Sequence, residues 1–163
     1  MTEFDALLAT LSDGGVEFIL IGGLAATAHG AIRTTRDIDV VYARSPENLA
    51  RIEAVLAPLA PYLRGAPPGL PFRLDAATLR AGLNFTLSTS LGDLDLLGEV
   101  AGGGTYEDLL AHTSPLELFG IRCLCVDLET LIQIKRAAGR PKDLEAIAEL
   151  EILREQRDHE RGG

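Results

Sequence analysis

Hydrophobic and polar positions along the chain follow two periods, one typical of helices and one of strands. Apolar residues at positions 4, 7, 8 and 11 have helical spacing and predict a first helix. Residues 18–21 form an apolar run, and a buried strand is predicted over 16–21. A short helix over 24–29 and a strand over 37–42 are predicted next. Strand, helix and strand in this order indicate a mixed α/β fold.

The rest of the chain continues this mixture. Ser45 followed by Pro46 predicts the start of a helix that runs to about residue 57. Residues 58–71 are rich in proline and glycine and are predicted to be a loop. Strands are expected over 84–89, 93–97, 116–119 and 122–126, and helices after Thr105 and from about 127 and 142. The predicted fold class is therefore α/β (α+β), a mixed sheet flanked by helices, with the C-terminal helices packed on it.

The length of 163 residues predicts a single domain over residues 1–153. Residues 154–163 are highly charged and are expected to fray as a tail. No apolar run approaches the ~20 residues of a membrane span, and the acidic N-terminus lacks the basic start of a signal peptide. These features predict a cytoplasmic protein without a membrane partner.

Two aspartates interrupt the apolar run of the second predicted strand. Asp37 and Asp39 are two positions apart, so they point to the same face, with Cα atoms roughly 6.6 Å apart. Two carboxylates at ~4 Å repel by about 4 kcal/mol at an effective dielectric constant near 20. Such a pair requires a proton or a cation, and oxygen ligands favour Mg²⁺ or Mn²⁺. Taken alone, Asp37 is equally compatible with a helix cap or an ion pair, and Asp39 with an exposed strand position.

Gly22 and Gly23 follow the first predicted strand at the start of a short helix. Bare backbone at such a turn can present N–H groups to phosphate, although a tight turn alone would also explain the two glycines. A phosphate-binding turn that faces metal-binding carboxylates would make a nucleotide site.

Three segments together resemble the nucleotidyltransferase superfamily. The first is Gly22-Gly23, thirteen further residues, and Asp37-Ile-Asp39. The second is the stretch 90–97, where Asp95 matches the third carboxylate of that superfamily. The third is residues 127–143, which match a C-terminal helix with a lysine followed by Gly-Arg-x-Lys-Asp. The resemblance covers about residues 16–150, and it is closest to the small stand-alone nucleotidyltransferases, including the AbiEii-type toxins.

The resemblance implies a nucleotidyltransferase-like fold and Mg²⁺-dependent transfer of a nucleoside monophosphate (NMP) from a nucleoside triphosphate (NTP) to a hydroxyl, with release of pyrophosphate. It implies that Asp37, Asp39 and Asp95 hold metal, and that Asp95 also acts as the base. Asp93 competes with Asp95 for this position because both lie on one strand face. The implied nucleotide-binding residues are Gly22, Gly23, Lys135 and Arg140.

The net charge of −9 argues against a general nucleic-acid-binding protein. The positive charges are grouped, however. Arg33 and Arg36 precede the Asp37 strand, and Lys135, Arg136, Arg140 and Lys142 fall within eight residues. This grouping favours a polyphosphate substrate, so Arg33 and Arg36 are also candidate nucleotide-binding residues.

Two other functions remain open from the sequence: a non-catalytic, antitoxin-like binding module that keeps the fold, and a metal-dependent phosphohydrolase. The intact set Asp37, Asp39 and Asp95 argues against the first. The absence of a histidine-rich cluster argues against the second. The acceptor is open among a protein, a tRNA end and a small molecule such as an aminoglycoside, and a cognate toxin or antitoxin would be a further partner. The 58–71 loop is expected to shape the acceptor side.

Overall fold

The computed structural model describes residues 2–32 and 34–162, and a seven-stranded mixed sheet runs through its centre. The order of the strands is β3-β4-β5-β2-β1-β9-β8. The pairs β2–β5 and β1–β9 are parallel and the others are antiparallel. The strands are β1 (Phe18–Ile21), β2 (Asp37–Tyr42), β3 (Tyr62–Leu63), β4 (Asn84–Thr89), β5 (Gly92–Leu97), β8 (Thr113–Leu118) and β9 (Ile121–Val126), and a separate small hairpin joins β6 (Glu99–Val100) to β7 (Gly104–Thr105).

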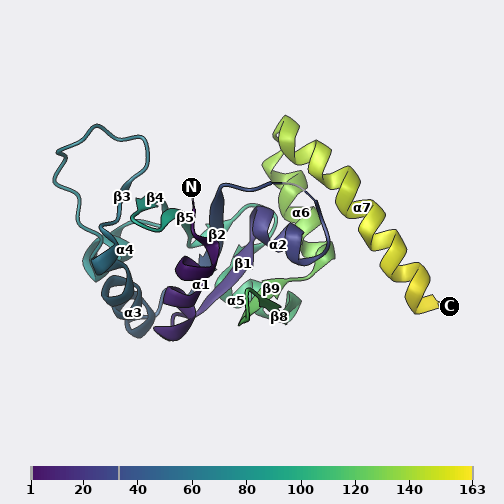
Figure 1. Ribbon diagram of the computed structural model, residues 1–163, viewed down its shortest axis with the longest axis horizontal. Coiled ribbons are helices and arrows are strands. Elements are labelled where there is room, and N and C mark those ends of the chain that lie inside the picture. Colours follow the sequence, from purple (N-terminus) through teal and green to yellow (C-terminus); the bar gives the residue numbers. More distant parts are fainter. Residues whose placement is uncertain (1, 33, 163) are drawn as a thin grey trace.

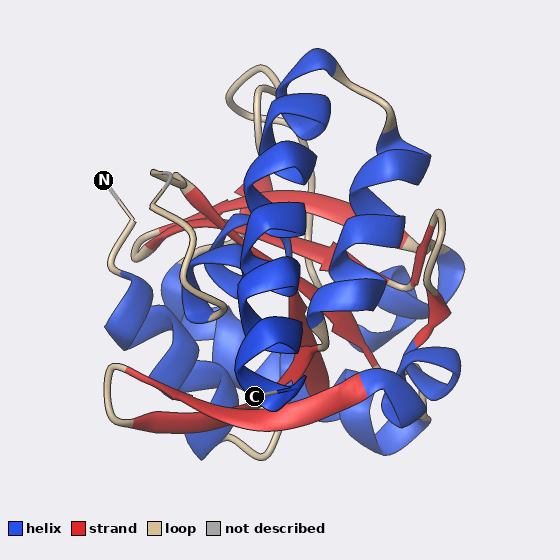
Figure 2. Cartoon of the chain, turned by 90° about the vertical axis from the view of Figure 1, so that its right-hand side faces the viewer, coloured by secondary structure: helices blue, strands red, loops and turns tan. Residues whose placement is uncertain are grey.

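Helices flank this sheet, as the sequence predicts (Figure 1). Helix α2 lies against β1 and β2 and also contacts α6, which packs on α7. Seen from the side of α7, this long helix crosses in front of the strands (Figure 2). The helices are α1 (Phe4–Asp13), α2 (Gly22–Ala28), α3 (Pro46–Leu56), α4 (Ala76–Ala81), α5 (Tyr106–Leu109), α6 (Leu128–Ala138) and α7 (Pro141–Gly162), with 3₁₀ turns at Ala57–Leu59 and Leu110–His112.

Local side-chain caps fix where several helices begin. Ser45 accepts a hydrogen bond from the Asn48 N–H at the start of α3, and Asp127 accepts one from the Thr130 N–H at the start of α6. Thr105 and the third residue of α5 form a reciprocal capping box. Because a cap satisfies backbone N–H groups that have no partner inside the helix, these helix starts follow from local sequence.

Alternation along β2 and β5 separates a core face from a polar face. Ile38, Val40, Leu94 and Leu96 are fully buried on one side. The aspartates between them point to the other side, because successive strand residues alternate. The hydrophobic core therefore holds these two strands rigidly beneath the polar face.

The prediction of a continuous loop over 58–71 is wrong in one respect. Tyr62 and Leu63 form β3, which pairs antiparallel with β4 through Tyr62–Ser88 and Leu63–Leu87. The nearby prolines favour a loop when the sequence is considered alone. Prolines are nevertheless tolerated just before an edge strand, and β3 is such a strand. The chain from residue 64 to 75 has no helix or strand and forms the large loop at the upper left of Figure 1.

The structure confirms the predicted fold class, a mixed sheet flanked by helices with α6 and α7 at the C-terminal end. Residues 154–162, which the sequence predicts to fray, are the last turns of α7. No helix among residues 2–32 and 34–162 has an apolar stretch long enough to cross a bilayer.

Candidate active site

Four carboxylates lie together where β2 and β5 run side by side. The two strands are parallel, and their register pairs Asp37 with Asp93 and Asp39 with Asp95. One carboxylate oxygen from each of Asp37, Asp39 and Asp95 lies within 4.8 Å of the corresponding oxygens of the other two. Asp93 is outside this group of three. The structure therefore brings together the three aspartates that the sequence analysis proposes as metal ligands.

The guanidinium of an arginine at the β3 edge of the sheet also reaches this cluster. Arg64 follows β3, and its Nη2 donates to Asp95 Oδ1 at 2.8 Å and to the Leu87 carbonyl at 2.7 Å. Its Nε lies 3.4 Å from Asp93 Oδ2, and its Nη1 lies 3.7 Å from Asp37 Oδ2. The sequence does not mark this arginine as a site residue, because it lies in the segment predicted to be a loop.

The positive charge at the cluster does not balance the negative charge. Burial raises the pKa of Asp39 to about 8, together with a hydrogen bond to Asp95 and the charges of Asp37 and Asp95. Burial and then the charge of Asp95 raise the pKa of Asp37, although Arg64 and Lys142 oppose this. A cation bound at the cluster would take the place of the proton that Asp39 retains near neutral pH. An oxygen-only set of three carboxylates fits Mg²⁺ or Mn²⁺.

The raised pKa of Asp39 predicts how stability depends on pH. In the unfolded chain this group titrates near 3.8 and in the folded protein near 8, so the folded state binds the extra proton between these values. The stabilising contribution is complete below about pH 4, decreases as the pH rises, and is lost above about pH 8. Asp39→Asn mimics the neutral acid and removes this titration.

We therefore expect the melting temperature of wild type to fall relative to that of Asp39→Asn between about pH 5 and about pH 8.5 in metal-free buffer. Thermal denaturation of both proteins across this range measures the difference. A constant difference in melting temperature would show that Asp39 titrates normally. A divalent ion should stabilise wild type more at the upper pH, because metal binding displaces the proton.

Gly22 begins α2 directly beside Asp39. Gly22 has φ +72°, and a Cβ added there would lie 2.0 Å from Asp39 Oδ2. A Cβ added at Gly23 would meet the Thr35 side chain at 2.7 Å. Only glycine fits at position 22, because a side chain would collide with the carboxylate and L-residues rarely adopt this φ. The backbone of the turn thus approaches the cluster as closely as it can.

A second charged group lies where α6 meets α7, centred on buried Asp143. The Lys135 Nζ lies 3.6 Å from Asp143 Oδ1, and the Arg140 Nε donates to Asp143 Oδ2 at 2.6 Å. Only 1% of the Asp143 side chain is exposed, against 16% for Lys135 and 58% for Arg140. Burial alone would raise the pKa of Asp143, but the hydrogen bonds and charge of Arg140 and the charge of Lys135 lower it.

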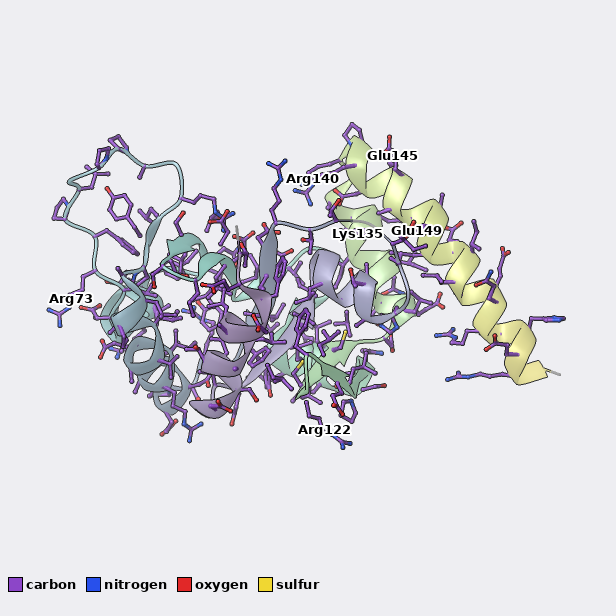
Figure 3. The ribbon with its side chains drawn as sticks, viewed as in Figure 1. Arg73, Arg122, Lys135, Arg140, Glu145 and Glu149 are labelled. Atoms are coloured by element: carbon purple, nitrogen blue, oxygen red, sulfur yellow. The ribbon has the colours of Figure 1, made fainter. Side chains whose placement is uncertain are left out.

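Asp143 therefore holds the two predicted nucleotide-binding cations in one place. The Arg140 backbone N–H also donates to Asp143 Oδ2, at 3.2 Å, which ties the first turn of α7 to the same carboxylate. Figure 3 shows Lys135 and Arg140 together at the α6–α7 junction. In the sequence, Asp143 ends the Gly-Arg-x-Lys-Asp segment and is equally compatible with an ordinary carboxylate at a helix start. Its neighbours in the sequence, Lys142 and Leu144, give no sign that two cations converge on it.

A cleft of about 580 Å³ joins the two charged groups. This volume is within the range of small-molecule sites. Arg36 is exposed and is not part of the cleft lining, so the structure does not bring it to the carboxylates. Arg33, also predicted to bind nucleotide, lies outside the described residues. The predicted site residues that line the cleft are Gly22, Gly23, Asp37, Asp39, Asp95, Lys135 and Arg140.

Comparisons with known proteins give fold likeness only. No family model matches the sequence, and no curated protein matches it either. Among solved structures, ANT(2″)-Ia in complex with adenylyl-2″-tobramycin is similar, with a TM-score of 0.58 and 16% identity, over 98% of this chain and 99% of that one. A Thermotoga maritima protein assigned to the nucleotidyltransferases gives a TM-score of 0.49 and 15% identity, over 98% and 96% of the two chains.

The first of these likenesses extends over nearly the full length of both chains, so it covers the sheet and the C-terminal helices alike. At 16% identity the likeness supports a shared architecture and gives no evidence about the reaction. Together with the observed strand order, it shows that the chain shares the mixed α/β fold of ANT(2″)-Ia.

Proposed function

We propose that this protein is a metal-dependent nucleotidyltransferase that moves an NMP group from an NTP to an acceptor hydroxyl. The observation that carries the proposal is the group Asp37, Asp39 and Asp95, whose oxygens converge within 4.8 Å on two neighbouring strands. The start of α2 and the lysine of α6 border the same cleft. Metal-binding carboxylates, bare backbone and a cation around one cleft fit a triphosphate substrate.

The aspartates take different parts in this proposal. Asp37 and Asp39 are the proposed metal ligands, and a divalent ion bound there would supply Lewis-acid charge neutralisation to the triphosphate. Asp95 completes the cluster and is the proposed base. The backbone N–H groups of Gly22 and Gly23 are proposed to contact the β- and γ-phosphates, because no side chain at these positions stands in the way.

The proposed step is an in-line substitution at the α-phosphorus. The acceptor oxygen forms a bond to that phosphorus, the bond from it to the bridging oxygen of the β-phosphate breaks, and pyrophosphate leaves. The acceptor hydroxyl proton passes to a carboxylate oxygen of Asp95. The residues contribute mainly position and charge neutralisation, as is usual for phosphoryl-group chemistry.

Lys135 and Arg140 are proposed to bind phosphate oxygens on the opposite side of the cleft. Both residues line the cleft, and Lys135 is the better supported of the two because its side chain is mostly buried there. Asp143 would orient its ammonium without neutralising it completely, at 3.6 Å. Arg140 is more exposed and is bound more closely to Asp143. No contact in the structure supports a phosphate-binding role for Arg36.

The acceptor is proposed to be a small molecule. The support is the fold likeness to a structure that holds adenylyl-2″-tobramycin, a nucleotidylated aminoglycoside. An AbiEii-like role in a toxin–antitoxin pair, with a protein or tRNA acceptor, rests on sequence resemblance alone.

The test is to incubate the purified protein with Mg²⁺ and an NTP labelled on either the α- or the γ-phosphate, together with aminoglycosides or cell extract. We expect the α-label, and not the γ-label, to appear on the acceptor, with an equal amount of pyrophosphate. Release of inorganic phosphate without pyrophosphate would instead indicate a phosphohydrolase. Tight NTP binding without any labelled acceptor would indicate a binding module.

A further inference from the structure

Among the arginines in the described part of the chain, only Arg64 contacts three different carboxylates of the cluster. The pairing of β3, β4 and β5 places Arg64 beside these carboxylates. Leu63 pairs with Leu87, and the next residue, Arg64, donates its backbone N–H to the Thr86 carbonyl at 2.9 Å. Thr86 in turn pairs with Asp95. Directly paired residues of neighbouring strands share a face, so Arg64 starts on the same face as the carboxylates.

The guanidinium is held firmly in this position. Nη2 is shared between Asp95 Oδ1 and the Leu87 carbonyl, at 2.8 and 2.7 Å. Only 27% of the side chain is exposed. Nε is buried and makes no hydrogen bond within the described part of the chain, and Asp93 Oδ2 lies 3.4 Å from it. A buried donor without a hydrogen bond costs free energy. The attraction between Arg64 and the surrounding carboxylates offsets this cost.

Arg64 and a divalent ion would need the same carboxylates. The two carboxylates nearest to Nη1 and Nη2, Asp37 and Asp95, both belong to the group of three whose oxygens converge. Asp39, the third member of that group, makes no ion pair with Arg64, whose contacts within the described residues are to Asp37, Asp93 and Asp95. The contacts of Arg64 therefore lie on the Asp93 side of the cluster, and the Asp39 side, which faces the cleft with Lys135, is free of them.

We propose that Arg64 is a positioning residue that acts as the built-in cation of the Asp93 side, where it orients Asp95 and competes with a divalent ion for Asp95 and Asp37. A divalent ion then binds from the Asp39 side. The metal-free protein keeps a neutralised, ordered Asp95, and its affinity for the ion is lowered by the arginine. The inference rests on the proposed function only in taking this cluster as the cation site.

The experiment is a titration of the full-length, nucleotide-free protein with Mn²⁺, followed by the electron paramagnetic resonance signal of free Mn²⁺. Arg64→Met removes the charge and keeps an unbranched, flexible side chain. We expect it to bind Mn²⁺ about tenfold more tightly than wild type, because a nearby positive charge no longer opposes the ion. A gain in affinity is not what damage to a purely structural residue would produce.

Arg73→Met is the matched control. Arg73 lies on the same loop and points to solvent (Figure 3), with 87% of its side chain exposed and only a long contact to Asp75. Its Mn²⁺ affinity should equal that of wild type. Unchanged or weaker binding by a folded Arg64→Met protein would overturn the inference.

Arg64→Lys covers the case in which Arg64→Met does not fold. A lysine keeps the charge but cannot contact three carboxylates at once, so Mn²⁺ binding should tighten by a smaller factor, about threefold. Unchanged affinity in this variant would also overturn the inference. Failure of the proposed function would appear differently, as absence of labelled acceptor with any NTP while Arg64→Met still binds Mn²⁺ more tightly than wild type.

Discussion

Asp39→Asn should reduce transfer of the α-label to the acceptor by about 10³-fold or more, since a bound metal supplies several kcal/mol of transition-state stabilisation. Asparagine keeps the shape of the side chain but lacks the charge needed to hold a divalent ion between β2 and β5. The measurement is the initial rate of labelled product at saturating Mg²⁺ and NTP. Calorimetric titration with NTP and Mg²⁺ should show the same loss in binding.

The control for this variant is Asp13→Asn, at the exposed end of α1 and outside the cleft. It carries the same chemical change and should transfer label at the wild-type rate. The melting temperature of Asp39→Asn in metal-free buffer near pH 8.5 should be at least that of wild type, because one repelling charge has been removed. Wild-type transfer rates in Asp39→Asn would remove the metal assignment from this cluster.

Gly22→Ala should lower both stability and transfer. The new Cβ would lie 2.0 Å from Asp39 Oδ2 at a residue with φ +72°. Positive φ alone costs an alanine about 1–2 kcal/mol, and displacement of the carboxylate adds to this, so we expect a total loss of about 3 kcal/mol or more in the free energy of unfolding. For a chain of this size that is a fall of roughly 6–12 °C in melting temperature. Transfer should fall by about 10²-fold, since a misplacement of ~1 Å has that effect.

Gly120→Ala separates the two causes of the loss. Gly120 has φ +75°, nearly that of Gly22, but a Cβ there would meet nothing within 4 Å. This variant should show the backbone strain alone, with normal transfer. Equal losses of stability in the two variants would contradict a collision with Asp39. Thermal denaturation and the labelling assay measure both effects.

Short-range patterns were enough to predict much of the site. The predicted strand over 37–42 matches β2, and the predicted strand over 84–89 matches β4. Alternation along one strand was enough to place Asp37 and Asp39 on one face, opposite the buried Ile38 and Val40. The caps of α3, α5 and α6 depend on residues three positions apart, so they too can be read from sequence.

The choice between Asp93 and Asp95 depended on register. Both lie on one face of β5, and in the sequence only the resemblance to the nucleotidyltransferases favours Asp95. The parallel pairing with β2 sets Asp95 opposite Asp39 and Asp93 opposite Asp37. Only the first of these two, Asp95, completes the group of three converging carboxylates.

The sequence by itself determined most strands of the central sheet, the starts of α3, α5 and α6, and the shared face of Asp37 and Asp39, because neighbouring residues and backbone geometry decide these. Only the tertiary structure decided which charges meet. Arg64 reaches Asp95 because β3 joins the sheet edge through β4, and Lys135 reaches Asp143 because α7 folds back on α6. These pairings depend on register and helix packing between separate elements, and no spacing along the chain encodes them.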